Sequence, residues 1–316
     1  MDHLTMTHGL ALSNLPVFIA QEYGLYRQAG VEVTLLRPSR APDVVNFLRQ
    51  GEAAMASCAF TSLMPLYEEG RSIRIVAGAG VLGLFVLGQA QVGGWDDLRG
   101  RQAATLRMDP LEILLYESLT AHGVPYESLQ VRYLSNPREL SQAFTEREVE
   151  VVTHVEPYAT QLIRDHGAKI LSNGTDRWGA SYPDCVIAAR VELLQERPEV
   201  VKAVLRALLR AQAAIEHDLA AACEAVAGRY YPASAGDLLQ AAASMPPGVD
   251  IRDQGEVILG RGAAMAALGY VRKLPDEGFL DFSLLEEVVR EERDLWASLR
   301  VRAADPEDGA QPPREA

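Results

Sequence analysis

Four reactive side chains lie where the sequence predicts the end of a β-strand or the start of a helix. Cys58 and His154 offer a thiol and an imidazole, the groups of a nucleophile and its base. Asp109 and Glu156 offer two carboxyls, the groups of general acid–base catalysis. Each also has a simpler interpretation as a strand-end thiol, a ligand contact or a helix cap. We expect ligand contacts and no catalytic residue, and we keep both pairs as catalytic alternatives.

The wider candidate site follows from the position of these residues between strands and helices. In open α/β sheets the ligand crevice lies outside the carboxyl ends of the strands, where helix N-termini present unpaired N–H groups. The predicted ligand-binding residues are Ser13, Asn14, Ser57, Cys58, Thr61, Arg107, Asp109, His154, Glu156 and Tyr182, with Asp184 at the rim. Arg107 offers a partner for an acidic group, whereas Asp109 and Glu156 favour a ligand with N–H or cationic groups.

The elements that must position these residues alternate between strand-like and helix-like patterns, which predicts an α/β fold with mostly parallel sheets. Proline and acidic start signals predict helices after Asn14, Asp109, Asn136 and Glu156. Long helices follow Pro198, and the sequence predicts one last helix at 282–299 and a disordered tail at 303–316. The predicted strands are 4–12, 31–36, 53–58, 73–77, 101–105, 129–134, 149–153, 169–171 and 185–189.

The composition excludes several functional classes. The chain has 316 residues, 48% of them hydrophobic, and a net charge of −13, with only three lysines. A chain this acidic repels a phosphate backbone, so we expect no nucleic-acid partner. The longest apolar runs are too short for a membrane helix, so we expect no direct membrane insertion. The three cysteines have no metal-ligand spacing, so we expect free thiols, no metal and no cofactor.

Several motifs carry a resemblance to a known family. The stretch L-S-N-L-P-V-F-I-A-Q-E-Y-G-L at 12–25, followed by G-V-E-V at 30–33, resembles the opening of substrate-binding proteins for nitrate, sulfonates, taurine and thiamine pyrimidine precursors. W-D-D-L-R-G at 95–100, E-P-Y-A at 156–159 and R-P-E at 197–199 resemble further elements of that family in the same order. The resemblance covers roughly residues 4–300.

The resemblance implies the two-lobe type II periplasmic-binding-protein fold, in which a ligand closes two α/β lobes around itself. Lobe one would be 1–86 plus 190–302, lobe two 87–189, and the two-strand hinge would lie near 85–89 and 186–190. The implied function is capture of a small polar molecule, sulfonate-like or amino-heterocyclic, for the membrane permease of an ABC importer, by a protein expected to be a monomer. Location would be periplasmic if a signal peptide is missing from the sequence, and cytoplasmic otherwise.

This chain lacks residues that are typical of the family's enzymes and of its anion-binding members. The pyrimidine-synthase branch uses a pyridoxal phosphate lysine, but no lysine precedes Lys169. The desulfinase branch has a cysteine in the first loop, where this chain has Leu15. Val155 stands where many sulfonate and nitrate binders carry a tryptophan. A cytoplasmic desulfinase-, decarboxylase- or synthase-like enzyme on the same fold remains the alternative function.

Overall fold

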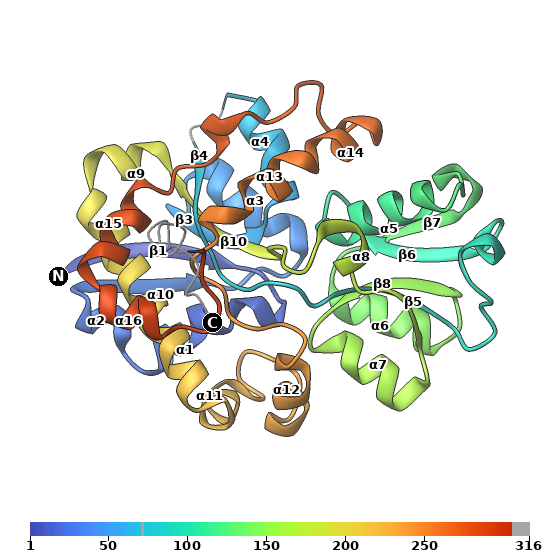
Figure 1. The fold of residues 1–316 in the computed structure, drawn as a ribbon, viewed down its shortest axis with the longest axis horizontal. Coiled ribbons are helices and arrows are strands. Elements are labelled where there is room, and N and C mark those ends of the chain that lie inside the picture. Colours follow the sequence, from blue (N-terminus) through green and yellow to red (C-terminus); the bar gives the residue numbers. More distant parts are fainter. Residues whose placement is uncertain (71–72, 305–316) are drawn as a thin grey trace, which may run out of the picture.

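The chain folds around two five-stranded sheets that lie side by side (Figure 1). The computed structural model describes residues 1–70 and 73–304. The first sheet has the strand order β2-β1-β3-β10-β4 and the second the order β7-β6-β8-β5-β9. Their bounds are β1 Asp2–His8, β2 Val31–Leu36, β3 Met55–Ala59, β4 Ile73–Gly78 and β10 Cys185–Arg190, then β5 Leu84–Gly88, β6 Gln102–Leu106, β7 Gln130–Leu134, β8 Val151–Val155 and β9 Lys169–Ser172.

The two sheets follow the same plan. In the first, β1 pairs in parallel with β2 and β3, and β10 runs antiparallel between β3 and β4. In the second, β6 pairs in parallel with β7 and β8, and β5 runs antiparallel between β8 and β9. Each antiparallel strand is the first one that follows a crossing from the other sheet. The carboxyl ends of the parallel strands therefore share one edge in each sheet.

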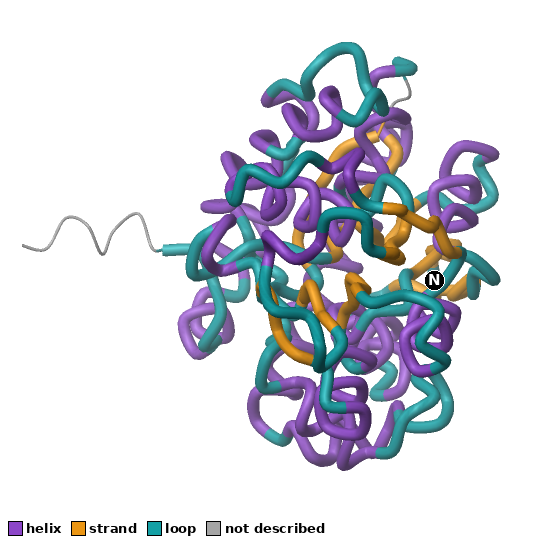
Figure 2. Tube along the Cα trace, turned by 90° about the vertical axis from the view of Figure 1, so that its right-hand side faces the viewer, coloured by secondary structure: helices purple, strands orange, loops and turns teal. Residues whose placement is uncertain are grey.

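Helices cover the faces of both sheets, so the strands lie inside the molecule (Figure 2). Prolines at the first helical turn and the side-chain caps Asp109 and Asn136 start several of them, as the sequence predicted. The α-helices are α1 Leu15–Glu22, α2 Leu25–Gln28, α3 Ala41–Gln50, α4 Met64–Glu68, α5 Pro110–Ala121, α6 Pro137–Thr145, α7 Tyr158–His166, α8 Thr175–Trp178, α9 Val191–Glu196, α10 Pro198–His217, α11 Leu219–Val226, α12 Ala235–Ala242, α13 Gly255–Gly260, α14 Gly262–Ala267, α15 Ser283–Glu291 and α16 Arg293–Ser298.

We call the part built on the first sheet the first-sheet half and the part built on the second the second-sheet half. The second-sheet half comprises β5 to β9 with α5 to α8. Helices α9 to α11, α15 and α16 pack with the first-sheet half, mainly around α10. Helices α12 and α14 reach α7 and α5 of the second-sheet half. The C-terminal helices therefore connect the two halves as well as covering the first sheet.

The predicted mixed fold with two mostly parallel sheets is confirmed, whereas the position of the hinge stays a prediction. The hinge was expected near 85–89 and 186–190. In the structure β5 pairs wholly within the second sheet and β10 wholly within the first. The chain crosses just before Leu84 and just before Cys185. The division into lobes at 86/87 and 189/190 stays a prediction, and strand pairing favours boundaries a few residues earlier.

Further elements also differ from the predictions. The last helix is interrupted at Glu292, whose backbone (φ −110°, ψ 36°) leaves the helical region, so it forms α15 and α16. The fully buried run at β5 is absent from the predicted strands, because the family resemblance placed the hinge there. Of the predicted tail, Ala303 is buried, and residues 305–316 lie outside the described residues.

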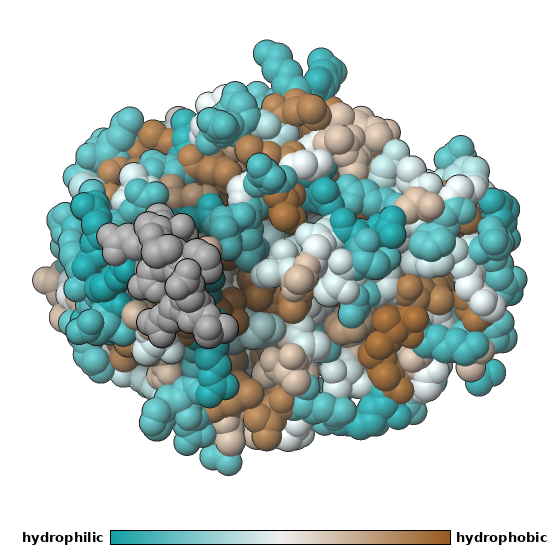
Figure 3. Space-filling view, in the orientation of Figure 1, coloured by the Kyte–Doolittle hydropathy of each residue, from teal (hydrophilic) through white to brown (hydrophobic). Residues whose placement is uncertain are grey.

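The face seen in Figure 3 is mostly hydrophilic over both halves, and its apolar patches are small and separate. No helix among residues 1–70 and 73–304 is both long and apolar enough to cross a membrane.

Candidate functional site

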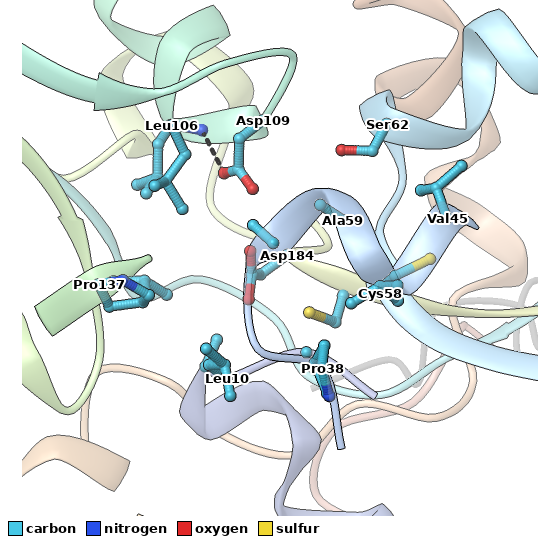
Figure 4. A pocket seen from close by; sticks show the side chains of 17 residues that line it. Leu10, Pro38, Val45, Cys58, Ala59, Ser62, Leu106, Asp109, Pro137 and Asp184 are labelled. Carbon is cyan, nitrogen blue, oxygen red and sulfur yellow. Dashed lines mark hydrogen bonds between the residues drawn. The ribbon is translucent and has the colours of Figure 1, made fainter. Parts of the chain in front are cut away.

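A small cavity of about 60 Å³ lies where the two sheets meet. We call it the inner cavity (Figure 4). It is lined by Gly9, Leu10, Ala11, Pro38, Ala41, Val44, Val45, Cys58, Ala59, Ser62, Leu106, Asp109, Leu111, Pro137, Val155, Asp184 and Cys185. Both halves contribute, so the cavity has the inter-lobe position that the sequence predicted for a ligand site.

The walls of the inner cavity come from the carboxyl ends of the parallel strands. Gly9 follows β1, Cys58 and Ala59 end β3, Leu106 ends β6 and Val155 ends β8. The antiparallel strand β10 begins at the same edge, which brings the residues just before it into the wall. The topology of the two sheets thus assembles the site from segments distant in sequence.

Two carboxyls, Asp109 and Asp184, are the charged groups that line this cavity, and within residues 1–70 and 73–304 no lysine, arginine or histidine joins them there. We call them the cavity carboxyls. Asp109 caps α5 by accepting the backbone N–H of Leu111 at 3.0 Å, drawn in Figure 4. Asp184 accepts the Ser13 hydroxyl at 2.6 Å. The two carboxyls therefore offer a ligand hydrogen-bond acceptors when ionised, and also a hydrogen-bond donor when protonated.

Removal from water raises the pKa of both cavity carboxyls. The pKa of Asp109 rises to about 7, through burial of the carboxyl and through the negative charge of Asp184. Burial raises the pKa of Asp184 to about 6, although the hydrogen bond from Ser13 opposes this change. An uncharged or cationic N–H group placed between them would favour their ionised forms.

Two thiols, Cys58 and Cys185, also line the cavity. Burial and the nearby carboxylates raise the pKa of both thiols well above its usual range. At neutral pH they are protonated, and a protonated thiol is a poor nucleophile.

His154 does not line the cavity, because β8 continues to Val155 rather than ending at Thr153 as predicted. Side chains alternate along a strand, so Val155 points to the cavity and its neighbour lies on the other face. The His154 Nδ1 accepts the Val155 N–H at 3.0 Å, and Nε2 lies 2.9 Å from the Ser141 hydroxyl. Burial lowers the pKa of His154 to about 3. The structure does not assemble a Cys58–His154 catalytic pair.

Glu156 also differs from its predicted place, since it caps α7 instead of lining the cavity. Its carboxylate accepts the backbone N–H and the hydroxyl of Thr160, at 3.0 and 2.8 Å. It accepts a third hydrogen bond from the Ser244 hydroxyl, at 2.6 Å, which links α7 to the segment after α12. The predicted acid–base pair of Asp109 with Glu156 is therefore not brought together around the cavity.

Three more predicted residues lie outside the cavity wall. Arg107 is exposed, and its guanidinium lies over the rings of Tyr133 and Tyr270, at 5.5 and 5.4 Å. The Tyr182 hydroxyl donates to the Asn173 carbonyl, which fixes the loop before β10. The Ser57 hydroxyl is buried and has no hydrogen-bond partner in the part of the chain that the structure describes.

Ser13, Asn14 and Thr61 support the cavity from behind. Ser13 holds Asp184, and the Asn14 side chain accepts the N–H of Gly9 and donates to the Ala11 carbonyl. The Thr61 hydroxyl donates to the Met108 carbonyl at 2.8 Å, across the boundary between the halves. These residues shape the wall without lining it.

Several wall residues were not predicted from the sequence. Leu10, Pro38 and Cys185 belong to the cavity because strands distant in sequence end side by side. Asp184, predicted only for the rim, lines the cavity itself. The one sequence signal for these residues was their position next to predicted strand ends.

Comparison with known proteins gives a family and a fold. No curated protein sequence matches the chain. The NMT1/THI5-like family model matches residues 13–221, which is more than half of the chain.

Solved structures with the same fold share little sequence identity with this chain. The ligand-binding component of an ABC-type import system from Staphylococcus aureus has a TM-score of 0.78 at 19% identity and covers 92% of this chain and 100% of its own. The nitrate-binding protein NrtA from Synechocystis PCC 6803 has a TM-score of 0.78 at 14% identity, covering 96% and 93%. The alkanesulfonate-binding protein SsuA from Xanthomonas axonopodis pv. citri, bound to MOPS, has a TM-score of 0.73 at 19% identity, covering 87% and 95%. The chain belongs to the NMT1/THI5-like family and has the type II periplasmic-binding-protein fold.

Proposed function

We propose that this protein is a solute-binding protein that captures a small polar organic molecule, without covalent chemistry, between its two halves. The single observation that carries the proposal is the inner cavity, which both halves line and to which the described part of the chain contributes two carboxyls and no basic side chain. Relatives of the same fold that bind sulfonate or nitrate support the general role.

The cavity carboxyls narrow the class of ligand. A bare nitrate or sulfonate would meet Asp109 and Asp184 without a cation to pair with, and burial in a low-dielectric site makes such repulsion strong. An amino-heterocycle or another molecule with N–H groups would donate to both carboxyls. We therefore favour an amino-heterocyclic ligand over a simple sulfonate.

The enzyme alternative has little support in the geometry. Cys58 is a protonated thiol, and the ring nitrogens of His154 contact other groups. The cavity carboxyls remain as potential proton donors and acceptors, since a pKa near neutrality is typical of catalytic groups as well as of ligand contacts.

The proposal includes the partners of a binding protein. The two halves would act as lobes that close on the ligand, with the crossings before Leu84 and before Cys185 as the hinge. The loaded protein would deliver its ligand to the permease of an ABC importer, outside the cytoplasmic membrane, and would act as a monomer.

A thermal-shift screen tests the proposal. Aminopyrimidines, taurine, aliphatic sulfonates, nitrate, flavins and aromatic acids would be tested separately. A ligand at a hundred times its Kd stabilises the folded state by about 2.7 kcal/mol. In a chain of this length, that stabilisation raises the unfolding midpoint by roughly a few degrees. We expect the aminopyrimidines to respond and nitrate not to respond. Turnover of a compound that gives no stabilisation would instead favour the enzyme.

A further inference from the structure

A second pocket, of about 370 Å³, opens beside the inner cavity, and we call it the outer pocket. The two share Leu10 and Pro38 as walls. The inner cavity is also lined by Pro137, and its neighbours Asn136 and Arg138 line the outer pocket. The outer pocket is therefore the continuation of the same crevice toward solvent.

The charge of the outer pocket is opposite to that of the inner cavity. Arg37, after β2 in the first-sheet half, and Arg138, in the first turn of α6 in the second-sheet half, both line it. Among the described residues neither guanidinium has an ion pair or a hydrogen bond, although most other arginines of the chain are paired with an acid. Two like charges brought together from opposite halves repel each other when the halves close.

Tyr158 adds a neutral donor to this pocket. Arg37 and Arg138 line the pocket together with Tyr158, and both guanidinium charges act on the Tyr158 hydroxyl. Burial nevertheless raises the pKa of Tyr158, so its O–H remains a donor at neutral pH. Two acids contact residues that line the outer pocket. Glu22 is held by Arg229 and by the Tyr230 hydroxyl, and Glu139 accepts hydrogen bonds from the Asn136 amide and the Ser135 N–H, so neither acid is paired with the two arginines.

We propose that the outer pocket binds an anionic group, a carboxylate, sulfonate or phosphate, that bridges Arg37 and Arg138 and thereby stabilises the closed arrangement of the two halves. An anion between two guanidiniums replaces their repulsion by two charge-assisted hydrogen bonds. The inner cavity, at about 60 Å³, has room for a head group only. This inference rests on the proposed function. The ligand would then be amphoteric, with an N–H head group in the inner cavity and an anionic group in the outer pocket.

The first experiment tests the anion pocket without any assumption about the ligand. The unfolding midpoint would be measured against sodium phosphate and sodium sulfate, at ionic strength held constant with sodium chloride. We expect saturable stabilisation of the wild type and its loss in the Arg37→Gln/Arg138→Gln double variant. The matched control is Arg40→Gln/Arg132→Gln, whose arginines are exposed and paired with Asp43 and Glu148. Equal stabilisation of both double variants, or none of the wild type, would overturn the proposal.

The second experiment identifies the source of the anion. Calorimetric titrations would compare 4-amino-2-methylpyrimidine-5-carboxylate with the corresponding carboxamide. If the ligand itself carries the anionic group, the carboxylate binds the wild type about tenfold more tightly than the carboxamide, and the Arg37→Gln/Arg138→Gln variant loses that preference. If both compounds bind equally while phosphate still stabilises, a separate anion occupies the outer pocket. If neither compound binds while phosphate stabilises, the proposed ligand class fails and the anion pocket stands.

Discussion

The chemistry of the inner cavity depends on two acids that share one small space. Burial, and after it the negative charge of Asp184, raises the pKa of Asp109 to about 7, and burial raises that of Asp184 to about 6, so both acids titrate close to neutral pH. A bound N–H or cationic group would lower the pKa of both carboxyls and so favour their ionised forms. The two carboxyls can therefore report on ligand binding as well as on folding.

The raised pKa of Asp109 predicts how stability depends on pH. Between pH 4 and 7 the folded carboxyl keeps a proton that the unfolded carboxyl has released, so stability decreases as pH rises, by up to about 1.4 kcal/mol per pH unit. Asp109→Asn removes this contribution and keeps a good helix cap. Urea unfolding without ligand at pH 5 and pH 8 should show a smaller loss of stability in this variant than in the wild type. The exposed Asp96→Asn should behave like the wild type, and a pH dependence unchanged by Asp109→Asn would contradict the assignment.

The protonated thiol of Cys58 predicts low reactivity. Iodoacetamide at pH 8 should label Cys58 in the folded protein far more slowly than in urea, because burial raises the thiol pKa. Cys58→Ser should keep ligand binding within a few-fold of the wild type, since the swap nearly conserves volume. Rapid labelling of Cys58 in the folded protein, coupled to loss of a catalytic activity, would support the enzyme instead. Mass spectrometry of peptides separates Cys58 from the other two buried thiols.

At the scale of elements, helix starts were the most predictable features. The Asp-Pro and Asn-Pro signals gave the N-caps of α5 and α6, because capping depends on neighbours within four residues. Asp109 was found in this way. Arg138 lies in the second of these signals, yet its role could not be predicted, because its partner Arg37 belongs to another sheet.

Strand ends were less predictable, and the site depends on them. β8 ends two residues later than predicted, so His154 lies within the strand, on the face opposite to Val155, and only Val155 reaches the cavity wall. Long-range pairing decided where β5 and β10 belong, and local sequence carries no information about that pairing. The fold class could be predicted from the sequence. Which side chains face the cavity could not, because that depends on where each strand ends and how it pairs with its neighbours.

The capping role of Glu156 at the start of α7 can be tested by substitution. Its hydrogen bonds to Thr160 and Ser244 fix the start of α7 against the segment that follows α12. Glu156→Gln turns an amide toward these donors, so we expect a loss of about 1–2 kcal/mol in urea unfolding. Glu148→Gln, at an exposed ion pair with Arg132, should cost less than about 0.5 kcal/mol. Equal effects of the two substitutions would contradict a capping role for Glu156.

At the scale of the whole molecule, hydrogen bonds across the boundary hold the two halves together. Glu112 in α5 accepts hydroxyl hydrogen bonds from Tyr126, Tyr133 and Tyr270. Tyr270 follows α14, in a segment that the Glu68 carboxylate anchors through the N–H groups of Arg272 and Lys273. The contact between Tyr270 and Glu112 thus joins the first-sheet half to the second-sheet half.

Removal of this contact should shift the molecule toward an open form. A hydrogen bond to a charged group contributes about 1.5 kcal/mol, so Tyr270→Phe should change the ratio of closed to open molecules about tenfold. Small-angle X-ray scattering without ligand should show a larger radius of gyration than in the wild type. Tyr23→Phe, at an exposed tyrosine in the first-sheet half, is the control. Identical scattering from all three proteins would show that this contact does not control closure.

The central claim, that the inner cavity binds an N–H-bearing molecule without transforming it, has one direct test. Calorimetric titration with 4-amino-2-methylpyrimidine would compare the wild type with Ala59→Leu, which fills the cavity, and with Ala121→Leu, on the exposed end of α5. We predict saturable binding of one ligand per chain, weakened at least about tenfold in Ala59→Leu by loss of the space. Ala121→Leu should bind like the wild type, and the ligand should be recovered unchanged. Absence of binding, undiminished binding in Ala59→Leu, or recovery of a chemically altered ligand would contradict the account.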